Sequence, residues 1–303
     1  MADDPKWPRA SEWLRGTHAG LAGGLAILGA PLRLGSITPG RCDLAPEAMR
    51  AALARYSTYD FGSGLDLRGL EVADLGDAPV ADATPEDAFA PLSNMVRDAL
   101  ATHETVILLG GDNSVTRPGV HGLGVPLERC GLLTIDSHLD LRSLESGLSN
   151  GNPVRALLAD GLPGPQIVQV GLQSFANSPA YAAVAREAGI RGITVEEVRD
   201  ASMGEVLVEA LDLLVGCDAI YVDLDLDAMD RMFSPGTPGS RPGGLTPGEL
   251  RTAAMICGGH PRVRVMDLVE LDPTKDIAEA TTLTAAACLL SFASGVQQRL
   301  ARA

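Results

Sequence analysis

Three residues in the stretch Asp136-Ser137-His138-Leu139-Asp140 can bind a metal ion or transfer a proton, because they carry two carboxylates and one imidazole. An apolar run at 132–135 comes directly before them, which predicts a buried strand that ends at Asp136. Alternate side chains of an extended segment point to the same side. We therefore expect Asp136, His138 and Asp140 to converge at the end of that strand.

Polar residues also follow three other predicted strands. These segments are Gly110-Gly111-Asp112-Asn113-Ser114, the acidic run Asp223-Leu224-Asp225-Leu226-Asp227-Ala228-Met229-Asp230, and Glu270-Leu271-Asp272-Pro273. Carboxylates that lie a few ångströms apart take up protons unless cations neutralise them. Oxygen ligands with one imidazole suit hard or borderline divalent ions such as manganese. A metal centre is therefore the expected use of these segments.

The elements that must bring these segments together alternate between strands and helices. The expected strands span 24–30, 69–75, 105–109, 131–136, 166–171, 190–194, 219–225 and 262–269. The expected helices span 47–56, 85–103, 153–160, 178–188, 196–214, 247–257 and 277–298. This alternation predicts an α/β fold, a three-layer α/β/α sandwich with a mostly parallel central sheet, in one domain over residues 1–303. Ligands bind such sheets beyond the carboxyl ends of the strands.

Composition restricts the partners that we expect. The chain of 303 residues is 46% hydrophobic, which is enough for a large buried core. Its formal net charge of -15 argues against a nucleic acid or an anionic membrane surface as partner, because both would be repelled. The charge says little about a small-molecule substrate, although an acidic surface could mildly favour a cationic ligand.

Cysteine usage and the N-terminus predict the compartment. The 5 cysteines are widely spaced and include no Cys-x-x-Cys pair, which is typical of buried thiols in a reducing environment. Residues 1–21 lack the basic and then continuously apolar pattern of a signal peptide. We expect no stretch of the roughly 20 uncharged apolar residues that span a membrane. The sequence therefore predicts a cytoplasmic protein.

The three motifs at 110–114, 136–140 and 225–230 resemble those of the ureohydrolase superfamily of arginase, agmatinase and formimidoylglutamase. The resemblance spans nearly the whole chain. It implies an arginase-like fold that holds two Mn²⁺ ions, with nickel or another divalent ion as alternatives, and a hydroxide that bridges them as nucleophile. Two cations lower the pKa of water enough to present hydroxide at neutral pH. The resemblance also implies a homo-oligomer, a trimer or a hexamer.

The acidic run allows two registers against the family pattern Asp-x-Asp-x-x-Asp. Starting at Asp223 places Ala228 third, whereas the second register matches Asp225, Asp227 and Asp230. We therefore expect Asp223 to be a hydrogen-bonded carboxylate beside the site. Residue by residue, the metal ligands that the resemblance implies are Asn113, Asp136, His138, Asp140, Asp225 and Asp227.

Asn113 is the departure from the family pattern, because most members carry a histidine ligand of the first metal there. An amide oxygen is a weaker donor than imidazole, so we expect the first-site ion to bind less tightly. The site then holds two ions, holds one with the second exchangeable, or has lost catalysis. The proton-shuttle histidine of arginases also has no counterpart in 149–155, which leaves the metal-bound water and Asp140 for proton transfer.

Four residues are assigned to substrate by the resemblance. Glu270 matches the glutamate that orients a guanidinium or amidinium group; its alternative role is an ordinary salt bridge. Asp140 and Glu270 are the expected catalytic residues, and Arg142, Asn152 and Glu270 the expected substrate contacts. An arginine suits a substrate with a carboxylate, although Arg142 could equally pair with Glu145. The loop 233–244 matches the family segment that closes over the metals, and its sequence does not select a substrate.

Arg142, the Gly-x-Pro-x-Arg segment 151–155 and the loop 171–177 resemble formimidoylglutamases more than arginases. The leading expectation is hydrolysis of N-formimino-glutamate to glutamate and formamide by the metal-bridging hydroxide. One alternative is an agmatinase or guanidino-acid ureohydrolase that releases urea. Another is a non-catalytic homologue with a degraded metal site, supported only by Asn113.

Overall fold

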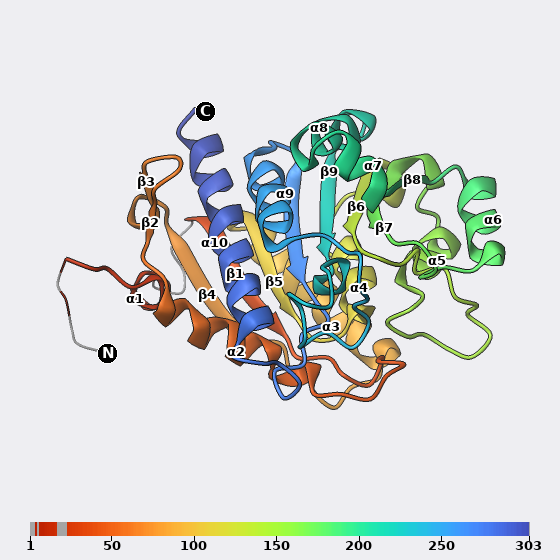
Figure 1. Ribbon diagram of the computed structural model, residues 1–303, viewed down its shortest axis with the longest axis horizontal. Helices are drawn as coiled ribbons and strands as arrows, with labels where there is room; N and C mark the ends of the chain where they lie inside the picture. Colours follow the sequence, from red (N-terminus) through yellow and green to blue (C-terminus); the bar gives the residue numbers. More distant parts are fainter. Residues whose placement is uncertain (1–3, 5, 17–22, 303) are drawn as a thin grey trace.

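The structure is a computed structural model that describes residue 4, residues 6–16 and residues 23–302 (Figure 1). The prediction that no signal peptide begins the chain concerns residues 1–21, several of which lie outside the described residues. The sheet and the helices discussed below all lie within the described part.

Eight strands form one sheet in which every neighbouring pair is parallel, as the sequence predicted. Their order is β4-β1-β5-β10-β9-β6-β7-β8. The strands are β1 (Gly23–Ala30), β4 (Val72–Asp77), β5 (His103–Gly110), β6 (Cys130–Ile135), β7 (Ile167–Leu172), β8 (Arg191–Thr194), β9 (Ala219–Leu224) and β10 (Val263–Leu268). A separate antiparallel pair joins β2 (Tyr59–Asp60) to β3 (Leu65–Asp66).

Helices cover both faces of the sheet, which confirms the three-layer α/β/α sandwich (Figure 1). In β5, Ile107 and Leu109 pack into one buried cluster while Val106 and Leu108 pack into the other. The first cluster includes residues of α1 (Ala10–Arg15), α2 (Ala45–Ala52), α7 (Val195–Asp200), α8 (Met203–Leu213), α9 (Pro247–Gly259) and α10 (Ala280–Leu300). The second includes residues of α3 (Pro85–Leu100), α4 (Thr116–His121), α5 (Pro153–Asp160) and α6 (Pro179–Ala188).

Two helix boundaries show what local sequence determines. A proline stands at the first position of α5, which spans 153–160 as predicted, because proline is already shaped for a first helical turn. The prediction of a single helix over 196–214 is wrong: Ala201 leaves helical geometry, and the Ser202 side chain accepts a hydrogen bond from Glu205 N–H to begin α8. Helices α1 and α4 were not predicted.

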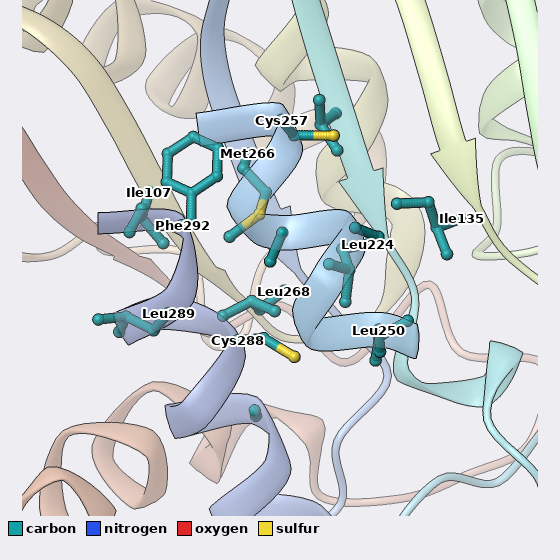
Figure 2. Packing of buried hydrophobic residues seen from close by; sticks show 14 of the residues in the cluster. Ile107, Ile135, Leu224, Leu250, Cys257, Met266, Leu268, Cys288, Leu289 and Phe292 are labelled. Carbon is teal, nitrogen blue, oxygen red and sulfur yellow. The ribbon is translucent and has the colours of Figure 1, made fainter. Parts of the chain in front are cut away.

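Helix α10 packs against α9 and the sheet in the larger cluster (Figure 2). The two helices cross closely at Gly258 and Gly295, where an added Cβ would meet backbone oxygen atoms at 2.2 Å. By length and composition α10 could cross a membrane, contrary to the sequence expectation, but 72% of that window is buried inside the molecule. Its apolar residues therefore serve the core.

Candidate active site

The four polar segments meet because β5, β10, β9 and β6 are consecutive neighbours in the sheet. Since these strands are parallel, their carboxyl ends lie at one edge, and each polar segment follows one of them. Asn113, Asp136, Asp225 and Glu270 are all buried there. The convergence that the sequence predicted at the end of β6 thus extends across four strands.

One group of possible metal ligands combines Asp136, His138 and Asp227, whose donor atoms lie within 4.8 Å of one another. His138 Nδ1 is 3.1 Å from Asp227 Oδ2 and 3.4 Å from Asp136 Oδ1. Burial alone would lower the pKa of His138, but the two carboxylates outweigh burial and raise it to about 11. The imidazole nitrogen therefore lies close to two carboxylates. This is the arrangement expected if all three side chains bind one cation.

A second group combines Asp136, Asp140 and Asp223, again with donor atoms within 4.8 Å. Asp136 therefore belongs to both groups. Burial raises the pKa of Asp136 to about 6, with a further contribution from Asp227, and raises the pKa of Asp140 well above its ordinary value, with a contribution from Asp136. Asp223, which the sequence placed beside the site, lies inside this group.

Asp225 belongs to neither group, but it lines a cavity that Asp140 and Asp227 also line. Its Oδ1 accepts a 2.7 Å hydrogen bond from Asp227 N–H. Burial raises its pKa well above the ordinary value, and Asp227 adds to the shift. The cluster so formed of carboxylates and one imidazole suits divalent cations such as manganese. Both oxygen atoms of the buried Asp223 lack a hydrogen-bond partner, which a bound cation would supply.

Asp140 and Glu270 adopt left-handed backbone conformations, with φ of 52° and 66°. Such conformations cost non-glycine residues about 1–3 kcal/mol and persist where surrounding structure enforces them, often at functional sites. Backbone hydrogen bonds from Arg155 N–H to Asp140 O and from Glu270 N–H to Gly111 O hold both residues in place. Both side chains line the cavity over the site.

Glu270 is held by two donors on one oxygen. Its Oε1 accepts hydrogen bonds from Asn113 N–H at 2.7 Å and from Asn150 Nδ2 at 2.9 Å. Burial raises the pKa of Glu270 to about 8, with Asp112 adding to the shift, while these two donors oppose it. Glu270 is therefore an oriented, buried group whose ionised form a cationic group in the cavity would stabilise.

The Asn113 side chain contacts Asp140 at the edge of the second group. Its Nδ2 donates to Asp140 Oδ2 at 2.6 Å, and its Oδ1 accepts from Thr116 Oγ1 at 2.7 Å. Ligation by Oδ1, as the sequence predicted, requires the amide to turn over. The structure places Asn113 next to the predicted ligands, with its nitrogen and not its oxygen directed at them.

A cavity of about 310 Å³ opens over these residues. The exposed arginines Arg142 and Arg241 line it, and so do His138, Asn150 and Glu270. Within the described part of the chain no ion pair joins Arg142 to Glu145, so this alternative for Arg142 finds no support. The cavity therefore has a buried acidic floor and two exposed cationic side chains.

Arg241 comes from the loop 233–244, which the sequence did not connect with substrate. Its Nη1 lies 2.7 Å from His138 Nε2 and 3.0 Å from Gly239 O. The loop approaches closely because residue 239 is glycine: an added Cβ would stand 2.0 Å from Asp227 Oδ2. The sequence did hold one signal for this role of Arg241, because it placed an arginine in a loop that was expected to close over the metals.

Asn152 does not line the cavity. Its side chain is buried and bonded to its own loop: Nδ2 donates to Ser143 O and Gly147 O, and Oδ1 accepts from Ser149 N–H. The predicted substrate contact by Asn152 is therefore not supported by its position. Asn150, two residues earlier, lines the cavity and holds Glu270.

Comparisons with known proteins agree with this geometry. Residues 24–294 match the sequence model of the Arginase family. Formimidoylglutamase of Halalkalibacterium halodurans is 34% identical over 277 residues, covering 90% of this chain and 87% of that protein. The crystal structure of formimidoylglutamase from Bacillus subtilis has a TM-score of 0.92 at 28% identity, covering 98% of this chain and 94% of that one. Trypanosoma cruzi formiminoglutamase, crystallised with Mn²⁺, has a TM-score of 0.89 at 25% identity, covering 97% of this chain and 99% of that one.

Proposed function

Because the chain belongs to the arginase family, we propose that it is a metal-dependent hydrolase of a C–N bond in a linear amidine, with N-formimino-glutamate as substrate. The relatives named formimidoylglutamase support this choice. The observation that carries it is the distribution of charge in the cavity, where buried Glu270 is accompanied by exposed Arg142 and Arg241.

This distribution fits a substrate with a cationic end and an anionic end. The Glu270 carboxylate is placed to accept N–H groups of an amidinium. Arg142 and Arg241 can each bind a carboxylate through the planar guanidinium fork. N-formimino-glutamate carries one amidine and two carboxylates, whereas agmatine carries a cationic tail that two arginines would repel. The arrangement therefore favours an acidic substrate over agmatine.

Asp136, His138, Asp140, Asp225 and Asp227 would hold two divalent cations, for which Mn²⁺ is our choice. When bound, such cations lower the pKa of water enough to supply hydroxide at neutral pH. Glu270 orients the amidine carbon for attack, and Asn150 and the Asn113 N–H fix the carboxylate. The bond from this carbon to the glutamate nitrogen breaks, and we assign Asp140 to return a proton to that nitrogen. Formamide and glutamate leave.

A product assay tests this function. Manganese-loaded protein is incubated with N-formimino-glutamate, agmatine and a series of guanidino acids, and formamide and urea are measured separately. Formamide from N-formimino-glutamate, with a kcat/KM at least about tenfold above that of any guanidino compound, is expected. Urea as the preferred product would assign the chain to the guanidino-hydrolysing members instead.

A second candidate is a non-catalytic homologue, which the orientation of Asn113 favours, because its amide nitrogen faces the ligands. Metal content separates the two candidates. A non-catalytic protein would retain much less than one Mn²⁺ per chain after loading and dialysis, and would turn over none of the compounds above. We expect the enzyme to retain at least one ion per chain.

A further inference from the structure

Asp223 is a buried carboxylate with no hydrogen-bond donor. Its exposed fraction is 0%, and neither Oδ1 nor Oδ2 has a partner among the described residues. An ionised carboxylate cannot remain in such surroundings without a compensating charge. Either a proton shared with the neighbouring carboxyl group of Asp267 or a bound cation must therefore compensate Asp223.

The neighbouring carboxylate shows the contrast. Asp267 is equally buried but accepts three hydrogen bonds: its Oδ2 from Tyr221 Oη at 2.7 Å and from Thr116 Oγ1 at 3.0 Å, and its Oδ1 from Leu224 N–H at 3.1 Å. The fold thus satisfies Asp267 and leaves Asp223, one strand away, unpaired. The two acids have different roles.

The position of Asp223 in the sheet directs it toward the metal centre. Asp223 pairs in register with Thr134 of β6. Asp223 precedes Asp225 by two residues, and Thr134 precedes Asp136 by two residues, so the two positions are equivalent on neighbouring strands. Residues two apart share a face of a sheet. The Asp223 carboxylate reaches within 4.8 Å of donor atoms of both Asp136 and Asp140. Two oxygen atoms bound to the same ion lie at most about 4.5 Å apart for bonds near 2.2 Å, so this spacing is close to what a shared ion requires.

We propose that Asp223 is a direct ligand of the ion held by Asp136 and Asp140. This inference rests on the proposed metal centre and adds a ligand to it. Asn113 stands beside the same group and presents its amide nitrogen to Asp140. Because the Asn113 oxygen is turned away from the ion, Asp223 supplies an oxygen donor that this ion lacks on the Asn113 side.

The competing explanation is that Asp223 is a neutral acid whose O–H donates to Asp267. Cysteine substitution separates the two, because a thiolate bound directly to Co²⁺ gives a sulfur-to-cobalt charge-transfer band in the near ultraviolet, and soft ligands favour Cd²⁺ over Mn²⁺. The variants are Asp223→Cys and, as matched control, Thr134→Cys, which places a thiol at the paired and equally buried position of β6.

Each protein is loaded with Co²⁺, and its spectrum is compared with that of the wild type, which carries five buried native cysteines. Asp223→Cys should show a new band and a Cd²⁺ to Mn²⁺ affinity ratio raised at least about tenfold. Thr134→Cys should show neither. A spectrum of Asp223→Cys that matches that of Thr134→Cys would overturn the proposal.

Asp223→Asn provides a second measurement that does not depend on the thiol. Titration calorimetry with Mn²⁺ should show one of the two ions weakened more than about 100-fold, because residues behind the ligands cost only about 10–100-fold when changed. Asp267→Asn removes a carboxylate on the neighbouring strand β10 and should weaken Mn²⁺ binding clearly less than Asp223→Asn does. Equal losses in both variants would contradict direct ligation. If the wild type itself binds no divalent ion, both the proposed function and the ligation by Asp223 are wrong. If the wild type binds Mn²⁺ and Asp223→Asn binds it equally well, only the ligation by Asp223 is wrong.

Discussion

Arg241 Nη1 lies 2.7 Å from His138 Nε2, while Nδ1 of the same ring faces Asp136 and Asp227. Arginine can only donate a hydrogen bond, so this contact keeps Nε2 unprotonated and the ring proton on Nδ1, although the two carboxylates that raise the pKa of His138 favour a proton on both nitrogens. When Nδ1 binds an ion, that proton must move to Nε2, where it opposes the Arg241 N–H. Metal binding at His138 should therefore release Arg241 from the imidazole and leave its guanidinium available to a carboxylate of the substrate.

Arg241→Ala should raise KM for N-formimino-glutamate about tenfold or more while kcat changes little. The reason is that a charge-assisted hydrogen bond contributes about 1.5–3 kcal/mol. Steady-state kinetics of the manganese-loaded protein measures the effect. Arg186→Ala on α6, whose side chain does not line the cavity, is the control. A KM that stays within twofold of the wild type would exclude Arg241 from substrate binding.

The metal-free protein should lose stability as pH rises. Burial raises the pKa of Glu270 from 4.5 to about 8 and that of Asp136 from 3.8 to about 6, with similar directions for Asp140 and Asp225. Groups whose pKa is raised in the folded state bind protons more tightly there than in the unfolded state. Their contribution to the free energy of unfolding is therefore complete below about pH 4 and is lost as pH rises through 6 to 8. Asp227, whose pKa is lowered, changes the stability only below about pH 4 and leaves this trend unaltered.

Melting temperatures with a chelator at pH 5.5 and pH 8.5 measure this dependence. We expect the lower value at pH 8.5, and we expect saturating Mn²⁺ to raise it, because ligand binding to the folded state adds stability. A metal-free protein that melts at the same temperature at both pH values would show that the buried carboxylates are neutralised in another way.

Asn150→Ala and Asn152→Ala should have separable effects. Asn150 donates to Glu270 in the cavity, so its loss should lower kcat/KM at least about tenfold with little change in melting temperature. Asn152 bonds only within its loop, so its loss should mainly lower the melting temperature. The reverse pattern would restore the sequence-based assignment of Asn152 to substrate.

Asn113→His should raise the affinity of the first ion about tenfold or more, because imidazole is a stronger donor than an amide. The new ring also removes the amide contact with Asp140. Mn²⁺ titration of the variant and the wild type is the measurement. Unchanged affinity and stoichiometry would mean that position 113 does not ligate the ion.

The strands and their polar ends were predictable from sequence because both depend on local patterns. Apolar runs that end in carboxylates, such as 131–136 and 219–225, mark buried strands meeting a site, and parallel order then brings their ends to one edge. The Pro at the start of α5 likewise predicted its first turn. These signals lie within a few residues of each other along the chain.

Contacts across the sheet and from distant loops were not predictable. Asp223 and Asp267 are similar acids in sequence, and only their neighbours in space show that three donors satisfy one and none satisfies the other. The reach of Arg241 to His138, 103 positions away, depends on the path of a loop that a glycine at 239 allows to approach. Asn150 and Asn152 differ by two positions, and the turn between them decides which faces the cavity. Sequence periodicity predicts the side of its own helix or strand on which a residue lies. Which residue of another element it contacts depends on how the tertiary structure packs the two elements together.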